Sequence, residues 1–443
     1  MLYLQKKYHI MKKVTFCILA YLGVLSCSIN AQDSTLARQI IRQLSSPEMF
    51  GRGCSYSGDK IAANFISNKC KELNLKSLEK NFFQPLSYPA FKMEGECYIK
   101  IGKTVLVAGK DYYIESFSHP IKNTKIPVLY TSSRAMSHPD SLQLFVNKHK
   151  RNIKNSIVYI KNSETGTNEE KAFLNSIRNR NPFGSQGIIV GQKQLPMAVT
   201  SHYPEEWNYA LIYVKDSVFG KYPKHISIVF NNEPLIHNSQ NVCAYIEGNE
   251  VADSFIVFSA HYDHLGTIGN KAYYPGAHDN ASGVAAVLDL AKYFSQNKPK
   301  YSVVFLFFCG EETGLIGSHY FTENPLIPLK KIKMFVNIDM FCGGDEGIMI
   351  VNSKTEQTSP FFETITKINS TNNYLAQIKS RPNAANSDHY FFSQHCPAIF
   401  IYTMGGKYGG YHDIYDTCDK CGLENYEKML NLIIESTKTH FNL

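Results

Sequence analysis

The stretch Phe255-Ile-Val-Phe-Ser-Ala-His261-Tyr-Asp263-His264 decides the fold and points to the chemistry. Its first six residues are mostly apolar, as expected of a strand that is buried on both faces of a parallel sheet. Its last four are polar or titratable, and open α/β sheets place their functional sites just beyond the carboxyl ends of such strands. The stretch therefore predicts a buried strand that ends at a functional site.

Three further apolar runs end in the same way. Tyr301 to Phe308 is followed by Glu311 and Glu312, Lys333 to Ile338 by Asp339, and Pro397 to Tyr402 by a glycine-rich loop that leads to Tyr411 and His412. Strands alternate with helical patterns from Asn241 onward, which is typical of a mostly parallel sheet with helices on both faces. We therefore expect an α/β fold with a mostly parallel, mixed sheet and one site built from several strand ends.

At 443 residues the chain is long for one ordinary domain, so we expect an insertion or a second domain. Residues 32–82 show helix-like apolar spacing around a Gly-Arg-Gly loop and are assigned to the N-terminal helical part of the main domain. Residues 83–236 contain short strand-like runs and are predicted to form a β-rich insertion. Residues 237–443 complete the main domain.

The N-terminal residues 1–31 are predicted to be an export signal. Met11-Lys12-Lys13 precedes a mostly apolar run of 12 residues, 14–25, which is too short to span a membrane. Cleavage after Ala31 is favoured, and the alternative is a lipoprotein box that would leave Cys27 acylated. The protein is thus expected in the periplasm, outside the cell or on its surface, with membrane attachment only through a lipid at Cys27.

Charge and cysteine content limit the classes of partner. The net charge is +8 (46 basic minus 38 acidic residues), and it is +4 (42 minus 38) without the lysines of the first 31 residues. Such a mild, dispersed charge does not favour a nucleic-acid partner. The nine cysteines after residue 31 are an odd number, and no disulfide framework can be read from them. Cys418 and Cys421 have the spacing of a metal or redox motif, but structural or disulfide use is favoured.

The polar residues at the strand ends mix imidazole and carboxylate groups, as divalent metals such as zinc prefer. The set is His261, Asp263, Asp279, Glu311, Glu312, Asp339 and His412. Each fragment alone is more often a turn or a solvated helix start. Together they lie next to a buried sheet, where unpaired carboxylates are costly, so metal is the expected partner. Two histidines and at least three carboxylates exceed the needs of one tetrahedral ion and fit two ions that share a carboxylate and a water.

The order of these motifs resembles the M28 family of di-zinc peptidases, which includes bacterial aminopeptidases and glutamate carboxypeptidase-like enzymes. The matching segments are His261-Tyr-Asp263-His264, Gly276-Ala-His-Asp279-Asn-Ala-Ser-Gly283, Glu311-Glu312-Thr-Gly-Leu-Ile-Gly-Ser318, Asn337-Ile-Asp339-Met340, Ser387-Asp-His389 and Tyr411-His412-Asp-Ile-Tyr-Asp416-Thr417. The resemblance covers the whole catalytic half of the chain. Residues 83–236 are similar, on less specific motifs, to a protease-associated domain.

The resemblance implies two Zn²⁺ ions per chain, with Co²⁺ or Mn²⁺ as possible substitutes. It places His261 and Asp339 on one ion and Glu312 and His412 on the other, with Asp279 bridging the two.

The resemblance also implies roles for residues around the ions. Glu311 is expected to be the general base, and Tyr411 is expected to stabilise the oxyanion of the tetrahedral intermediate. Asp263 is expected to orient His261, and Asp416 to do so near His412. His389 is expected to lie behind the ligands, with a packed core histidine as the alternative.

These expectations predict an exported zinc exopeptidase that acts on peptides. Aminopeptidase activity is favoured, and carboxypeptidase or dipeptidase activity is the alternative within the family. A glutaminyl-cyclase-like activity is less favoured because that chemistry uses a single zinc. A non-catalytic binding protein on the same scaffold is a further alternative, disfavoured because all five implied ligands and the base are present.

Overall fold

The computed structural model describes residues 34–163, 165–199, 208–220, 222–405 and 410–443. The predicted export signal, including Cys27, lies outside the described residues. Among those that are described, no helix combines the length and the apolar character that crossing a membrane requires.

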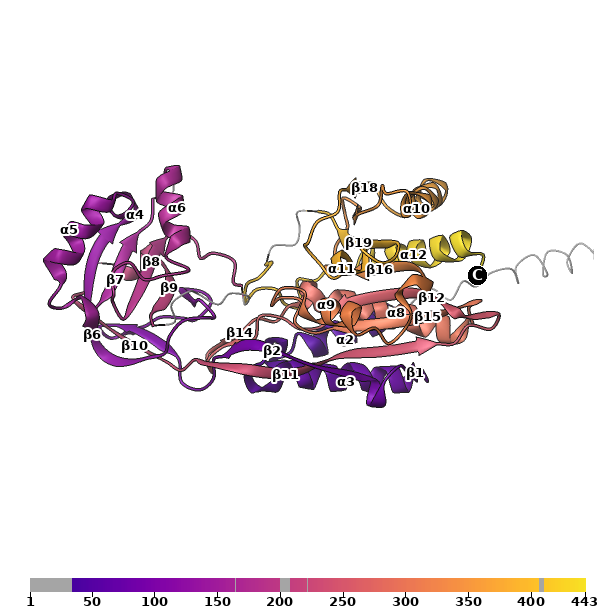
Figure 1. Ribbon diagram of the computed structural model, residues 1–443, viewed down its shortest axis with the longest axis horizontal. Coiled ribbons are helices and arrows are strands. Elements are labelled where there is room, and N and C mark those ends of the chain that lie inside the picture. Colours follow the sequence, from indigo (N-terminus) through magenta and orange to yellow (C-terminus); the bar gives the residue numbers. More distant parts are fainter. Residues whose placement is uncertain (1–33, 164, 200–207, 221, 406–409) are drawn as a thin grey trace, which may run out of the picture. The chain divides into compact units, whose positions relative to one another are not determined.

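The larger sheet has nine strands and carries the predicted site (Figure 1). Its strand order is β1 (Lys76–Ser77), β11 (Glu233–Ile246), β15 (Tyr301–Phe308), β12 (Val251–His261), β16 (Ile332–Ile338), β19 (Ala398–Thr403), β17 (Ile348–Val351) and β18 (Ile378–Arg381), and β2 (Phe83–Lys92) also pairs with β11. Strands β15, β12, β16 and β19 are parallel neighbours, whereas β11 and β17 run antiparallel to them. The predicted mostly parallel, mixed sheet is thus confirmed.

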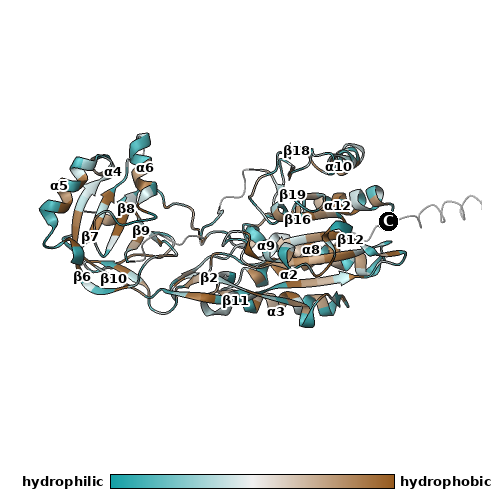
Figure 2. Cartoon of the chain, viewed as in Figure 1, coloured by the Kyte–Doolittle hydropathy of each residue, from teal (hydrophilic) through white to brown (hydrophobic). Residues whose placement is uncertain are grey.

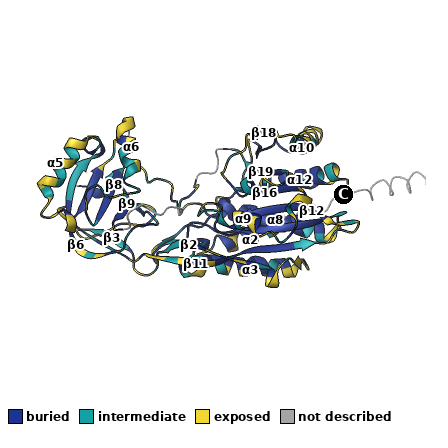
Figure 3. Ribbon diagram, in the orientation of Figure 1, coloured by how far each residue is buried: buried dark blue, intermediate teal, exposed yellow. Residues whose placement is uncertain are grey.

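Alternating side chains of the central strands explain why helices cover both faces of this sheet. On β12, Ile256 and Phe258 belong to one buried core and Val257 to another, as the two-residue period of a strand requires. The first core also contains apolar residues of α2 (Ser34–Leu44), α3 (Gly58–Glu72), α8 (Ser282–Gln296), α10 (Ser359–Asn372) and α12 (Tyr426–Phe441). The second contains residues of α9 (Ile316–Glu323) and α11 (His389–Phe392). Figure 3 shows α8 and β12 largely in the colour of buried residues.

A second, eight-stranded sheet is formed between Tyr98 and Phe230. Its order is β4 (Thr104–Val105), β3 (Tyr98–Ile101), β10 (His225–Phe230), β6 (Ile121–Ser132), β7 (Ile157–Lys161), β8 (Gly187–Gln192), β9 (Ala210–Lys215) and β5 (Tyr112–Ile114). The helices of this segment are α4 (Ser133–Met136), α5 (Pro139–His149), α6 (Asn168–Ser176) and α7 (Asp216–Phe219). Strands β7 and β8 are largely brown in Figure 2, in keeping with the buried apolar residues that they carry.

The boundaries of the second sheet differ from those predicted for the insertion. Residues 83–92 form β2, which pairs with residues 233–242 of β11 in the larger sheet. The predicted limits at 83 and 236 therefore fall inside this antiparallel pair, which leads the chain out of the larger sheet and back. Both sheets belong to one unit of the structure, Ser34–Leu443.

The second sheet buries a carboxyl group at the end of β5. The Glu115 side chain is only 2% exposed, and its Oε1 lies 3.1 Å from Nη2 of Arg178. The hydroxyl of Tyr113 donates a hydrogen bond to Oε2 of Glu115 at 3.1 Å. Burial outweighs these partners and raises the pKa of Glu115 from 4.5 to about 7.

We expect Glu115→Gln to reduce the loss of stability that the protein shows at rising pH. Because the folded-state pKa of Glu115 lies above its unfolded value, the folded chain holds the proton more tightly, and stability falls as the pH rises from 4.5 to about 7. The full cost at pH 8 is about 3 kcal/mol. Thermal unfolding at pH 5 and pH 8 measures it. The exposed Glu96→Gln is the control, and an equal pH dependence in wild type and Glu115→Gln would contradict the prediction.

Candidate metal centre

Three neighbouring parallel strands bring their carboxyl ends to the same edge of the larger sheet. His261 is the last residue of β12 and lies opposite Phe308, the last residue of β15. Asp339 directly follows β16. Both site residues are almost fully buried, with His261 1% and Asp339 5% exposed. Convergence of the strand ends, which the sequence predicted, thus places these two side chains together.

Asp279 reaches the same edge from a short π-helical turn, Ala277–Ala281, just before α8. The side chain of Asn280 ties this turn to the end of β16, because its Nδ2 donates to the Ile338 carbonyl at 3.0 Å and its Oδ1 accepts the Met340 N–H at 3.1 Å. The carboxylate of Asp416 accepts the N–H groups of His278 and Asp279 at 2.7 and 3.0 Å. The position of Asp279 is therefore fixed from two sides.

Two sets of side chains meet at the two carboxylate oxygens of Asp279. In the first set, Nε2 of His261 lies 3.2 Å from Oδ1 of Asp279 and 3.3 Å from Oδ1 of Asp339. In the second, Nε2 of His412 lies 3.2 Å from Oδ2 of Asp279 and 3.1 Å from Oε2 of Glu312. The structure thus brings together all five residues that the sequence proposed as ligands, with Asp279 common to both sets.

The spacing and chemistry of these atoms fit a pair of zinc ions. Nitrogen and oxygen ligands about 2.0–2.1 Å from a tetrahedral zinc lie about 3.3 Å from each other. The four distances of 3.1 to 3.3 Å match that separation. The charge of Asp279 also acts to raise the pKa of both Glu312 and Asp339, and divalent cations would compensate this repulsion between buried carboxylates.

His264 is a residue of this centre that the sequence analysis did not assign. Its Nδ1 lies 2.6 Å from Oε1 of Glu312, and ligand atoms of His264, Asp279 and Glu312 gather within 4.8 Å of one another. The 2.6 Å separation is shorter than that of two ligands on one zinc and fits a hydrogen bond to a carboxylate. His264 therefore orients Glu312, and its place in the same motif as His261 was the available signal.

Asp263 holds the turn that carries the two glutamates. Its carboxylate accepts the N–H groups of Glu311 and Glu312 at 3.1 and 3.3 Å. Its Oδ1 lies 3.7 Å from Nδ1 of His261, the ring that it was expected to orient. In this structure Asp263 therefore mainly fixes the backbone of the Glu311–Glu312 turn.

The ring of His412 is oriented by a main-chain group of the segment between β8 and β9. Its Nδ1 donates to the carbonyl oxygen of Ala198 at 2.7 Å, and the N–H of Ala198 donates back to the His412 carbonyl at 3.2 Å. The bond to Ala198 leaves Nε2 of His412 as the atom that faces Asp279 and Glu312. Asp416, expected to act near His412, instead bonds the segment that carries Asp279.

Glu311 and Tyr411 border the two ligand sets. Burial raises the pKa of Glu311 well above its ordinary value, while the nearby His261 opposes this shift. Tyr411 is 43% exposed, and its ring stacks on that of His412 with centroids 3.9 Å apart. Glu311 thus lies next to the ligands, and Tyr411 lies at the surface above His412.

His389 and its neighbour Asp388 are both fully buried. Nε2 of His389 lies 3.1 Å from Oδ1 of Asn383, and its ring packs against Phe400. Burial raises the pKa of Asp388, which the sequence analysis did not single out, to about 7. The hydroxyl of Ser387 donates to Oδ2 of Asp339 at 3.0 Å, so this segment supports a ligand through Ser387.

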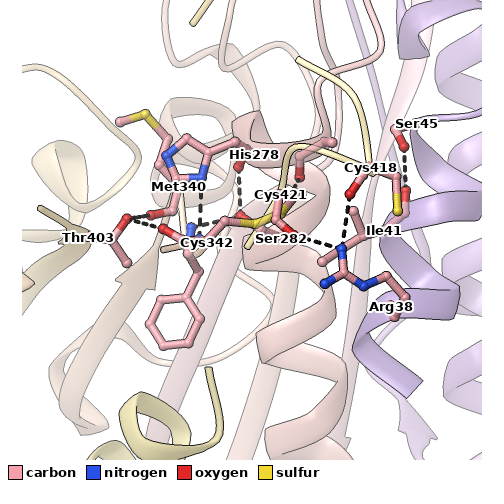
Figure 4. Close-up of a disulfide and its surroundings, with 12 residues drawn as sticks. Arg38, Ile41, Ser45, His278, Ser282, Met340, Cys342, Thr403, Cys418 and Cys421 are labelled. Atoms are coloured by element: carbon pink, nitrogen blue, oxygen red, sulfur yellow. Dashed lines mark hydrogen bonds between the residues drawn. A yellow bond between two sulfur atoms is a disulfide. The ribbon is translucent and has the colours of Figure 1, made fainter. Parts of the chain in front are cut away.

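A disulfide between Cys342 and Cys421 connects the segment after Asp339 with the segment after His412 (Figure 4). Helix α2 also binds this region, because Nη1 of Arg38 donates to the carbonyls of Cys418 and Cys421 at 3.0 and 2.7 Å. Cys418 is a free, buried thiol. The favoured structural use of Cys421 is therefore seen, but its partner is Cys342 and not the other cysteine of the motif.

We expect the double variant Cys342→Ser/Cys421→Ser to unfold at a lower temperature than wild type. The disulfide closes a loop of 79 residues, which should stabilise the protein by about 4 kcal/mol through the unfolded chain. Differential scanning calorimetry measures the loss, with Cys54→Ser as control. Alkylation of unreduced, denatured protein should label the seven free cysteines of the described residues and miss two. Labelling of all nine would contradict the disulfide.

Comparison with known families identifies the part of the chain that holds this centre. Residues 241–437 match the sequence model of Peptidase family M28. These residues belong to peptidase family M28. The match includes all five residues of the two ligand sets, so the M28 part of the chain coincides with the geometry described above.

A solved structure extends the likeness to the fold beyond the M28 segment. BSAP, a zinc aminopeptidase from Bacillus subtilis, superposes with a TM-score of 0.68 at 16% sequence identity, covering 92% of this chain and 95% of that one. At this identity the likeness concerns the fold. It supports the mixed α/β architecture for both sheets.

Curated relatives match parts of the chain. A vacuolar membrane protease of Candida glabrata is 27% identical over 218 residues, or 49% of this chain and 19% of the relative. A probable zinc metalloprotease of Pyrenophora teres f. teres is 36% identical over 126 residues, or 28% of this chain and 26% of the relative. The chain thus spans about a fifth to a quarter of the length of these relatives.

We expect protein reconstituted with zinc to bind two ions per chain. Asp279→Ala should reduce the content below one ion, because Asp279 contributes an oxygen to each ligand set. His389→Gln should retain both ions, since His389 belongs to neither set. Inductively coupled plasma mass spectrometry of desalted protein gives the ratio. A single ion in wild type, or two in Asp279→Ala, would contradict the shared site.

Proposed function

We propose that this protein is a zinc-dependent exopeptidase, with aminopeptidase activity favoured. The observation that carries the proposal is the division of the two Asp279 oxygens between two histidine–carboxylate sets, with Glu311 beside them. Membership of residues 241–437 in the M28 family supports a peptidase. The intact ligand sets and Glu311 disfavour a non-catalytic binding protein on this scaffold.

Two zinc ions held by these residues would lower the pKa of a water molecule and polarise the scissile carbonyl. Glu311 then acts as the general base, taking a proton from the attacking water and returning it to the leaving amine. Asp263 fixes the backbone of Glu311, and burial raises the pKa of its carboxyl group, which suits a group that must both accept and release a proton.

We infer that Tyr411 stabilises the negative charge that develops on the carbonyl oxygen. Its ring stacks on His412, which fixes the phenol beside the second ligand set. At 43% exposure the side chain can contact an incoming peptide. A hydroxyl that donates a hydrogen bond to the developing oxyanion lowers the barrier to its formation.

We also propose that the protein acts outside the cytoplasm. The predicted export signal at residues 1–31 supports this location. The Cys342–Cys421 disulfide agrees with it, because disulfides persist in oxidising compartments and are rare in the cytosol.

Mass spectrometry of one unmodified peptide incubated with the zinc-loaded protein tests the activity. Stepwise loss of residues from the N-terminus is the expected result and identifies an aminopeptidase. Loss from the C-terminus would assign a carboxypeptidase, and cleavage of dipeptides alone a dipeptidase. Absence of cleavage of a diverse peptide mixture, with two zinc ions verified, would overturn the proposed function.

We expect Glu311→Gln to lower kcat by about a thousandfold while both zinc ions stay bound, since general acid–base catalysis contributes roughly 10² to 10⁴ in rate. The amide keeps the size of the side chain and the backbone contact to Asp263, but it cannot accept the proton. Steady-state kinetics and metal analysis of the same preparation give both values. Activity near that of wild type would remove Glu311 from its role.

A further inference from the structure

A cavity lies next to the metal centre, between the turn that follows His261 and the beginning of the second sheet. It is lined by Tyr88 and Ala90 of β2, by Ile114 and Asn232, and by His264 and Thr313. The volume in which the centre of a water-sized group fits is about 80 Å³. This is several times the roughly 10–15 Å³ that one water needs. The cavity can therefore hold part of a larger ligand.

One polar atom of this lining comes from the metal centre. His264 is 2% exposed, and its Nδ1 is engaged with Glu312. The other ring nitrogen, Nε2, has no hydrogen-bond partner among the described residues. Because Nδ1 is engaged with the Glu312 carboxylate, Nε2 is the ring atom that is left for a ligand.

A second such atom comes from Asn232, just before β11. Asn232 is 3% exposed, and its Nδ2 donates to the carbonyls of Ser116 and Ser118 at 2.7 and 2.8 Å. These two bonds fix the orientation of the amide, so its Oδ1 is an acceptor, and it too is unpartnered within the described parts of the chain. Two buried polar atoms without partners are costly unless a ligand supplies the partners.

The remaining lining restricts the charge of such a ligand. Arg52 also borders the cavity, but its guanidinium donates five hydrogen bonds to main-chain carbonyls, namely those of Tyr262, Leu44, Pro275, Gly276 and Asp279. A guanidinium has five N–H groups, so Arg52 has none left for an anion. Apolar side chains, among them Ala90 and Ile114, make up part of the rest of the wall.

The cavity borders the turn that carries Glu311 and Glu312. Thr313 directly follows the zinc-ligand candidate Glu312, and Asp263, which fixes the Glu311–Glu312 turn, is also part of the lining. A peptide whose carbonyl lies at the ligand sets would have a neighbouring side chain within reach of this space.

We propose that this cavity is a substrate subsite for an uncharged side chain that ends in a hydrogen-bond donor, with the carboxamide of glutamine as the best match. The proposal rests on the proposed peptidase function. The NH₂ group supplies a donor for Oδ1 of Asn232, the carboxamide has both an N–H and an oxygen with which to pair Nε2 of His264, and the methylene groups pack on the apolar part of the wall. A carboxylate offers no N–H to Oδ1 of Asn232 and would share the cavity with the carboxylate of Asp263, and a thioether supplies no donor.

The test compares tripeptides that carry glutamine, methionine or glutamate at the first or second position and alanine elsewhere. Isothermal titration calorimetry measures their binding to the zinc-loaded Glu311→Gln protein, so the readout does not depend on turnover. At one of the two positions we expect the glutamine peptide to bind about tenfold more tightly than the methionine and glutamate peptides. Equal binding, or a preference for glutamate, would overturn the subsite.

A matched pair of variants locates the preference. Tyr88 and Ala90 line the cavity from the same face of β2, so Ala90→Leu, made in the Glu311→Gln protein, should fill the space and abolish the preference for glutamine. Ser87→Leu adds similar bulk to the opposite, exposed face and should leave the preference unchanged. A preference that survives Ala90→Leu would overturn the assignment. Failure of wild type to cleave any peptide would instead overturn the proposed function, which this binding assay does not read.

Discussion

The position of Asp279 is the constraint on which the rest of the centre depends. One carboxylate can serve two ligand sets only if both of its oxygens are held at ligand distance from His261 and His412 at once. The chain meets this requirement with main-chain contacts. Asn280 ties the turn to β16, Asp416 binds its N–H groups, and Arg52 binds the Asp279 carbonyl at 3.1 Å. Burial lowers the pKa of Arg52 only to about 10, so its positive charge persists near the carboxylates at neutral pH.

The two ligand sets differ in how the fold supports them. His261 and Asp339 lie at the ends of adjacent strands, whose ladder of hydrogen bonds fixes both backbones. Glu312 and His412 lie on connecting segments and depend on side-chain and main-chain partners, which are Asp263, His264 and Ala198. The second set therefore depends on Ala198, which lies between β8 and β9. The part of the chain that forms the second sheet thus helps to build the centre.

Parallel topology explains why so much of this centre could be predicted from the sequence. Apolar strands that end in His261, Glu311 or Asp339 have only one edge of the sheet at which to converge, so the ligand sets follow from the order of strands. The bond from His412 to Ala198 could not be predicted, because a main-chain carbonyl has no residue-type signature. The disulfide could not be predicted either. Cys342 and Cys421 are separated by 79 residues, and an odd number of cysteines does not show which of them pair.

The limits predicted for the insertion, residues 83 and 236, fall inside the strand pair β2 and β11, because the sequence does not show which strands pair. Strand-like patterns at residues 83–92 do not reveal which sheet a strand joins, since that depends on pairing over about 150 residues. The pairing has a functional consequence. The same β2 that joins the larger sheet contributes Tyr88 and Ala90 to the cavity that His264 also lines. Asn232, just before β11, contributes an unpartnered oxygen to it. The point at which the chain leaves and re-enters the larger sheet therefore also shapes the space where a substrate side chain would bind.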